Sequence, residues 1–300
     1  MSFNDDVYRD QLYTEQQSRI LVTVPRITGA LSILGSAAII YIIAQDWKKK
    51  LRKVYHRLLL SFSIFDLVCS LNYALSSVVV PKGTPGVWGA SGNAATCEAS
   101  GFFMNFTFTV AVYATFICVY YLLVLKYGIR ERTIARRIEP AVHFVAILYP
   151  ILLGGIALRK DLYNPANIGV GFCFLNCYPM DCLRNEDIEC ERGGDYEWWL
   201  VAHSSPVFLF FGVVVISSLL TAHAVRSTEL RGQRWSISHE NSRFRIREST
   251  TQAYLYIAAF FLVYSAFGVA FLIGMPATRE NRAVYFWLVL NSRIFLPMQG

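Results

Sequence analysis

Long apolar runs alternate with short polar segments along the whole chain. A helix needs about 20 apolar residues to cross roughly 30 Å of hydrocarbon, whereas a strand of a membrane barrel needs only about 10. Because the runs are too long for barrel strands, the pattern predicts an all-α membrane protein. We count seven runs, which would form a seven-transmembrane-helix bundle: 27–44, 58–80, 101–125, 141–158, 198–225, 253–273 and 283–300.

The two ends of the chain differ from this pattern. Residues 1–19 are polar and mixed in charge, without the apolar core of a cleavable signal peptide. We therefore expect an extracellular N-terminal segment over 1–26 and a transmembrane domain over 27–300. The seventh run is short, carries Arg293 and reaches Gly300. We expect the C-terminal tail to be absent and the sequence to be a fragment.

Composition supports a lipid environment. Apolar residues make up 54% of the chain and charged residues only 16%, whereas a soluble domain carries about 25% charged residues. The net charge of +7 could suggest nucleic-acid binding. The basic residues, however, lie in short segments between the runs, so we expect the bilayer as a partner and no nucleic acid.

The basic residues also predict an orientation. Of the 28 Lys and Arg residues, 17 lie after the first, third and fifth runs, and about ten lie on the other side. An excess of Lys and Arg in short loops marks the cytoplasmic side. The pattern therefore predicts a multi-pass plasma-membrane protein with an extracellular N-terminus.

Cysteine positions agree with this orientation. Cys69 and Cys118 lie inside runs, where a small apolar filler is the simplest role. The other five fall on the side assigned as extracellular, where disulfides can form: Cys97, Cys173, Cys177, Cys182 and Cys190. A zinc site is the alternative, although no His accompanies the four in the long second outer loop.

Two disulfides fit these positions. Cys97 directly precedes the third run, so its natural partner is Cys173 in the long second outer loop. Cys182–Cys190 would then close a small acidic loop and leave Cys177 free. The sequence alone leaves the connectivity open.

Short motifs resemble the G-protein-coupled receptor superfamily over essentially the whole chain, and within it the cyclic-AMP-receptor-like branch of protists. The motifs are His56–Ser61 leading to Asp66, Thr96–Cys97 followed by Gly101–Phe103, Tyr120–Leu123, Gly171–Phe174 and Pro297–Gly300. There are two departures. Phe174 stands where that branch has Trp, and Tyr121–Leu123 replaces the Asp-Arg-Tyr triplet of rhodopsin-like receptors.

The resemblance implies a cell-surface receptor that senses an extracellular small ligand and signals through a heterotrimeric G protein. The alternative is a seven-helix transporter or channel without G-protein coupling. Transporters often place charged relays at the midplane and show paired repeats, but the third and sixth runs lack charges. A membrane enzyme would need a His or acidic cluster near one face, so we expect no enzymatic activity and no cofactor.

One ion pair is predicted inside the membrane. At 1.5 Å per residue, Asp66 lies about 13 Å above the inner boundary, and Arg293 about 16 Å below the outer one. In a core of roughly 30 Å the two reach the same height, and the second and seventh helices are neighbours in receptor bundles. We therefore predict an Asp66–Arg293 pair, either direct or bridged by water.

Two further sets of residues are candidates for function. Small-molecule pockets combine aromatic walls with a few polar groups, which suggests a ligand pocket of Phe103, Phe106, Glu197, Trp198, Trp199 and His203. Trp at a helix end is also a common interface anchor. The G-protein-facing candidates are Arg130, Arg132, Arg136, Arg137, Arg243, Arg245 and Arg247. Attraction to anionic lipid explains the same arginines without a G protein.

Overall fold

The computed structural model describes residues 13–166, 171–179, 182, 189–234, 251, 258 and 282–299. Five helices in these ranges are long and apolar enough to cross a membrane: Glu15–Gln45, Val54–Val79, Ala94–Leu125, Glu131–Arg159 and Tyr196–Ala224. They correspond to the first five apolar runs. The sixth run, 253–273, lies outside the described residues except for residue 258. The seventh contains a shorter helix, so the full seven-helix bundle stays a prediction.

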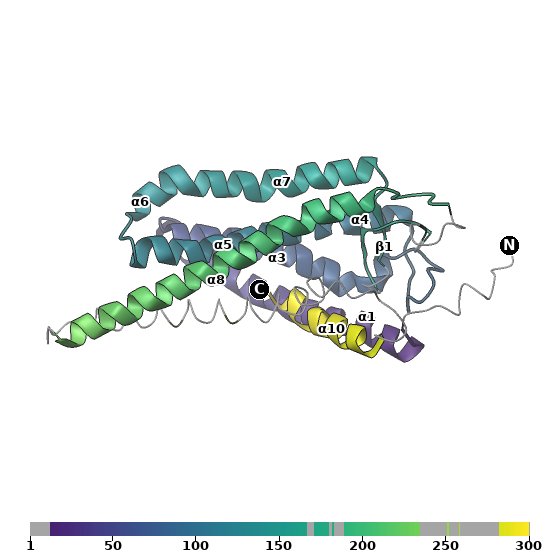
Figure 1. The fold of residues 1–300 in the computed structure, drawn as a ribbon, viewed down its shortest axis with the longest axis horizontal. Helices are drawn as coiled ribbons and strands as arrows, with labels where there is room; N and C mark the ends of the chain where they lie inside the picture. Colours follow the sequence, from purple (N-terminus) through teal and green to yellow (C-terminus); the bar gives the residue numbers. More distant parts are fainter. Residues whose placement is uncertain are drawn as a thin grey trace.

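The elements follow one another along the chain as helices with a single small hairpin (Figure 1). The long helices are α1 (Glu15–Gln45), α3 (Val54–Leu75), α4 (Ala94–Met104), α5 (Phe106–Leu125), α7 (Glu139–Arg159), α8 (Tyr196–Arg234) and α10 (Arg282–Phe295). Shorter turns are α2 (Trp47–Lys50), η2 (Ser76–Val79), α6 (Glu131–Thr133), η3 (Ile134–Ile138) and η4 (Leu296–Gln299). The antiparallel hairpin pairs β1 (Tyr163–Pro165) with β2 (Cys173–Leu175).

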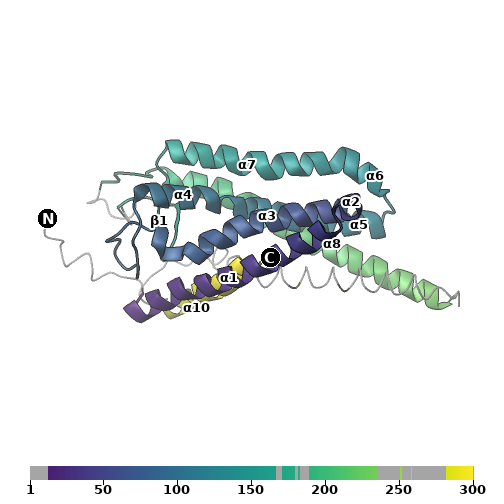
Figure 2. The same cartoon turned by 180° about the vertical axis from the view of Figure 1, so that it is seen from behind.

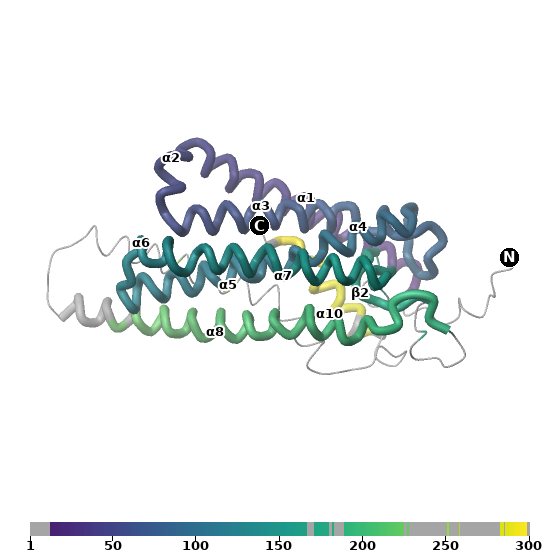
Figure 3. Tube along the Cα trace, turned by 90° about the horizontal axis from the view of Figure 1, so that it is seen from above, coloured from purple at the N-terminus to yellow at the C-terminus, as the bar shows by residue number. Residues whose placement is uncertain are grey.

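Helix α5 lies at the centre of the bundle. It packs against α3, α7 and α8, while α1 packs against α3 and α10. Figure 2 shows α1 beside α10 from behind, and Figure 3 shows from above that α1 and α8 lie on opposite sides of the bundle. We call the end with β1, β2 and the start of α4 the hairpin end, and the end with α2 and α6 the basic end.

The bundle buries its aromatic core around α5 and leaves apolar side chains on its outside. Tyr113, Val110 and Ile117 are buried, and the Phe108 ring lies 4.5 Å from the ring of Tyr149 on α7. Large exposed apolar residues gather on α1 and α7, including Leu34 and Phe144. Exposed apolar faces of this extent are unfavourable in water, whereas lipid solvates them.

Two helices begin earlier than the apolar runs indicate. Helix α1 starts at Glu15, inside the segment expected to precede the first helix, because Thr14 and Gln17 form a capping box. Helix α4 starts at Ala94, where Asn93 and Thr96 form another. Capping and packing extend a helix through polar residues that hydropathy excludes.

Gly101 supplies a test of the packing between α4 and the hairpin. A Cβ atom at this position would lie 2.4 Å from Cδ1 of the Tyr163 ring. We predict that Gly101→Ala destabilises the protein by about 1–3 kcal/mol through overpacking, seen as a lower melting temperature in detergent micelles.

Gly155 is the matched control, because nothing lies within 4 Å of a Cβ placed there. Gly155→Ala should leave the stability unchanged or raise it by up to about 1 kcal/mol through helix propensity. Equal melting temperatures for the two variants would contradict the packing.

Candidate functional site

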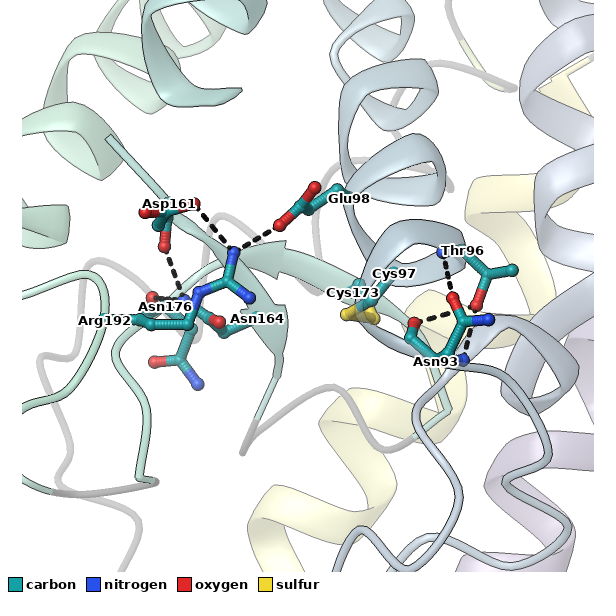
Figure 4. Close-up of polar contacts among 9 residues, drawn as sticks. All are labelled: Asn93, Thr96, Cys97, Glu98, Asp161, Asn164, Cys173, Asn176 and Arg192. Atoms are coloured by element: carbon teal, nitrogen blue, oxygen red, sulfur yellow. Dashed lines mark hydrogen bonds and ion pairs between the residues drawn. A yellow bond between two sulfur atoms is a disulfide. The ribbon is translucent and has the colours of Figure 1, made fainter. Parts of the chain in front are cut away.

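A disulfide joins the hairpin to α4. The Asn93–Thr96 capping box fixes the start of α4 and so places Cys97 in the first turn. Cys97 bonds to Cys173, the first residue of β2, with a Cα–Cα distance of 5.3 Å (Figure 4). This is the pairing that the sequence favours, and it holds the hairpin across the mouth of the bundle.

Side-chain amides hold the hairpin itself together. The Asn164 amide donates to the carbonyl of Asn176 at 2.8 Å, and the Asn176 amide donates to the carbonyl of Pro165 at 2.7 Å. The Asn105 amide, at the junction of α4 and α5, donates to the buried Tyr163 hydroxyl. Burial raises the pKa of the Tyr163 phenol above its ordinary value, so the hydroxyl stays protonated and acts only as a neutral partner.

Ion pairs add a polar rim to the hairpin end. Arg192 pairs with Glu98 on α4 and with Asp161 at 3.1 Å (Figure 4). Lys160 lies 2.6 Å from Asp195, and its hydrogen bond holds the pKa of that carboxyl below its ordinary value. Exposed pairs of this kind contribute little stability, so their role is to orient the loop relative to α4 and α8.

The remaining outer cysteines form a close group. Cys182 bonds to Cys190, as the sequence suggests, and Cys177 is free and buried. The three sulfur atoms lie within 4.8 Å of one another. Zinc binds thiolates, and only the Cys177 sulfur is unbonded, so this group does not fit the zinc alternative.

The six pocket candidates do not share one face. His203 is buried, with its ring 4.9 Å from that of Phe174 on β2, and Phe106 packs among the rings of Phe65 and Phe102. The side chains of Phe103, Glu197 and Trp198 are exposed, Trp198 by 81%. Trp199 is half-buried and donates to Asp195 at 3.3 Å. Successive residues of a helix point about 100° apart, so neighbours on α8 cannot all face the bundle, and Trp198 suits an interface anchor.

Asp66 is buried at the interface of α1 and α3. Its Oδ2 atom accepts hydrogen bonds from Ser36 at 2.7 Å, Ser32 at 3.0 Å and Ser70 at 3.3 Å. Three hydroxyl donors therefore surround the carboxyl in place of the cation that the sequence suggests.

The prediction of a direct Asp66–Arg293 ion pair is wrong. Among the described residues no pair within 4.0 Å joins them; the Arg293 guanidinium instead lies 3.8 Å from the centre of the Phe172 ring. Helical side chains lean toward the N-terminus of their own helix. Since α3 and α10 run in opposite directions, the two side chains lean away from each other even where their backbones reach a similar height.

The basic end contains an ion pair that the sequence does not reveal. Arg57 donates to both carboxylate oxygens of Glu139, at 2.6 and 2.5 Å, and to the carbonyl of Leu51 at 2.6 Å. Glu139 is buried, and its neighbour on the next turn, His143, bonds to the Tyr113 hydroxyl at 2.8 Å. Glu139, one of two acids in the segment before the fourth run, was the available signal, but its partner on α3 is 82 residues away.

The arginines predicted to face a G protein are placed only in part. Arg130, Arg132, Arg136 and Arg137 are exposed around α6 and η3 at the basic end. Arg243, Arg245 and Arg247 lie outside the described residues. The exposed four are accessible to a partner or to lipid head groups.

The disulfide between α4 and β2 gives a second test. We predict that Cys97→Ser and Cys173→Ser each lower the free energy of unfolding by roughly 2–4 kcal/mol, and that the double variant loses no more than either single one. Each substitution breaks the same bond, so the effects cannot add. Denaturant unfolding in micelles measures this.

Cys177→Ala serves as the control, because no covalent link is lost. Dithiothreitol also reduces Cys182–Cys190, so in its presence the wild type and the serine variants should have the same stability. A double variant that loses twice as much as a single one would show that the cysteines contribute separately and would contradict the bond.

One family model matches the chain. Residues 16–131 match the model of the serpentine type 7TM GPCR chemoreceptor Srj. The match runs from the first turn of α1 to the start of α6 and so covers the helices that correspond to the first three apolar runs. No curated protein matches the sequence. The cyclic-AMP-receptor-like branch stays a prediction, and the match supports a GPCR-like family of serpentine chemoreceptors for this part of the chain.

Proposed function

We propose that the protein is a chemosensory receptor of the plasma membrane, which binds a small ligand at the hairpin end and activates a heterotrimeric G protein at the basic end. The observation that carries the proposal is the serpentine chemoreceptor match over residues 16–131. The same residues form helices of membrane-spanning length in the structure. Fold alone does not specify function, so the two ends supply the remaining support.

The hairpin end faces outside in this proposal. Both disulfides lie there, and disulfides persist in an oxidising compartment. The loops with Lys48–Lys50 and with the exposed arginines around α6 lie at the opposite end, as expected for the cytoplasmic side. Two independent kinds of residue therefore favour one orientation.

A ligand would bind near the hairpin that the Cys97–Cys173 disulfide holds to α4. The Phe174 ring on β2 packs against His203 on α8, and Cys173 holds the same strand to α4. A ligand that contacts this strand could therefore shift α4 and α8 relative to each other. Small-molecule sites use aromatic walls with few polar groups, and Phe174 and His203 supply both.

A line of polar contacts leads from the middle of the bundle to the basic end. Tyr113 on α5 bonds to His143 on α7, His143 lies 3.6 Å from Glu139, and Glu139 binds Arg57 on α3. These contacts join three helices through groups with discrete partners. Movement of α5 would change this set of contacts, which lies one turn from the exposed arginines.

Reconstituted membranes provide the test. The protein in lipid nanodiscs, with purified heterotrimeric G proteins and a panel of defined small odorants, should accelerate binding of a non-hydrolysable GTP analogue. Charge reversal by Arg132→Glu with Arg136→Glu should remove the acceleration, because it repels a surface that docks to arginines. Arg159→Glu, an equally exposed arginine at the hairpin end, should not.

Liposome flux measurements complete the test. Odorant-independent passage of ions or solutes, with no acceleration of nucleotide exchange, would favour the transporter or channel alternative. Loss of exchange in both arginine variants would instead point to a general effect of charge at the membrane surface.

A further inference from the structure

Arg293 is a buried cation without an acidic partner in the described structure. Arg293 is 4% exposed. No carboxylate among the described residues lies within 4.0 Å of its guanidinium. Asp66, the partner that the sequence predicts for Arg293, instead accepts hydrogen bonds from three serine hydroxyls. Removing a charge from water costs several kcal/mol, so a buried arginine calls for a compensating group.

The undescribed sixth run cannot supply that group. Residues 251–279 contain no Asp or Glu. The Phe172 ring gives a cation–π contact at 3.8 Å, which compensates a desolvated cation only in part. That contribution is smaller than the cost of burying the charge.

Hydrogen bonds hold the backbone of Arg293 and the loop that carries Phe172. The Thr28 hydroxyl on α1 donates to the Arg293 carbonyl at 3.1 Å. The loop before β2 is held nearby, because the Ser76 hydroxyl donates to the carbonyl of Gly171 at 3.3 Å. Phe172 is therefore placed above Arg293 by the contact of Gly171 with Ser76 of η2 and by the disulfide at Cys173.

The side chains between Arg293 and the hairpin end are apolar. Val289 and Phe286 precede Arg293 by four and seven residues, so they share its face of α10, and both belong to a buried cluster with Leu21 and Val22 of α1. Because the Arg293 side chain leans toward the N-terminus of α10, its guanidinium approaches this cluster and the Phe172 ring.

We propose that Arg293 binds the carboxylate of a small organic acid with an apolar body, entering from the hairpin end. The planar guanidinium matches a carboxylate with two parallel hydrogen bonds. A single cation balances one negative charge, which favours a monocarboxylate over a phosphate dianion. The apolar cluster of α1 and α10 and the Phe172 ring suit an acid whose remaining part is aromatic or aliphatic. The inference rests on the proposed receptor function and names the chemical class of its ligand.

Thermal unfolding of the full chain in nanodiscs tests the site directly. Benzoate and hexanoate should raise the melting temperature of the wild type in a saturable way, whereas benzamide, which is neutral and nearly the same shape, should not. Inorganic phosphate should have a smaller effect than either acid. A larger effect of phosphate would overturn the assignment to carboxylates.

Two substitutions separate binding from structure. Arg293→Met should abolish the response to benzoate and raise the melting temperature of the ligand-free protein, because it removes a buried charge that has no acidic partner among the described residues. Arg293→Lys keeps the charge but loses the planar fork, and should weaken benzoate binding at least about tenfold. A lower melting temperature for Arg293→Met together with an unchanged response in Arg293→Lys would show a purely structural role and overturn the proposal.

Arg19 is the matched control. It also stacks on an aromatic ring, Trp88 at 5.5 Å, but it is exposed and pairs with Glu15. Arg19→Gln should keep the full benzoate response. If benzoate binds through Arg293 but no nucleotide exchange occurs, the receptor function is overturned and the site is supported. If odorants drive exchange but carboxylates have no effect, the site alone is overturned.

Discussion

In a lipid environment every backbone polar group must be satisfied within a helix, and apolar side chains gain nothing by leaving lipid for another helix. Interhelical polar contacts therefore have to determine which helices pair and in which register. The structure has such contacts at three interfaces: Asp66 with serines of α1, the Asn72 amide with the carbonyl of Ser100, and the Thr109 hydroxyl with the carbonyl of Ala146. The apolar exterior and the polar interior follow from the same constraint.

The two ends of the bundle apply this constraint differently. At the hairpin end a covalent bond, two asparagine amides and the Arg192 ion pairs fix an irregular loop against α4. At the basic end the main interhelical contact is the ion pair between Arg57 and Glu139, with exposed arginines beside it. In the proposed receptor, the hairpin end would hold the ligand, and the basic end, held by fewer charged groups, would pass on the signal. Arg293, buried between them, is where ligand charge would enter the bundle.

Sequence reasoning succeeded for features that depend only on the position of residues along the chain. Hydropathy located the cores of the first five helices, and cysteine positions favoured the Cys97–Cys173 and Cys182–Cys190 pairs that the structure contains. It failed for features that depend on how helices and their side chains are oriented in space. The start of α1 depends on a capping box at Thr14, the separation of Asp66 from Arg293 depends on the direction of their helices, and the different environments of Trp198 and His203 depend on helix phase. Helix direction was available from the topology, whereas phase and long-range partners such as Glu139 require the packed bundle.

Labelling of single cysteines on intact cells tests most directly that lipid separates the two ends, with the hairpin end outside. Ser91 in the loop before α4 and Lys49 in α2 are both exposed, and the free cysteines of the described residues are buried. A membrane-impermeant maleimide should label Ser91→Cys on intact cells and Lys49→Cys only after permeabilisation. Labelling of Lys49→Cys on intact cells, with Ser91→Cys protected, would contradict the orientation and the function built on it.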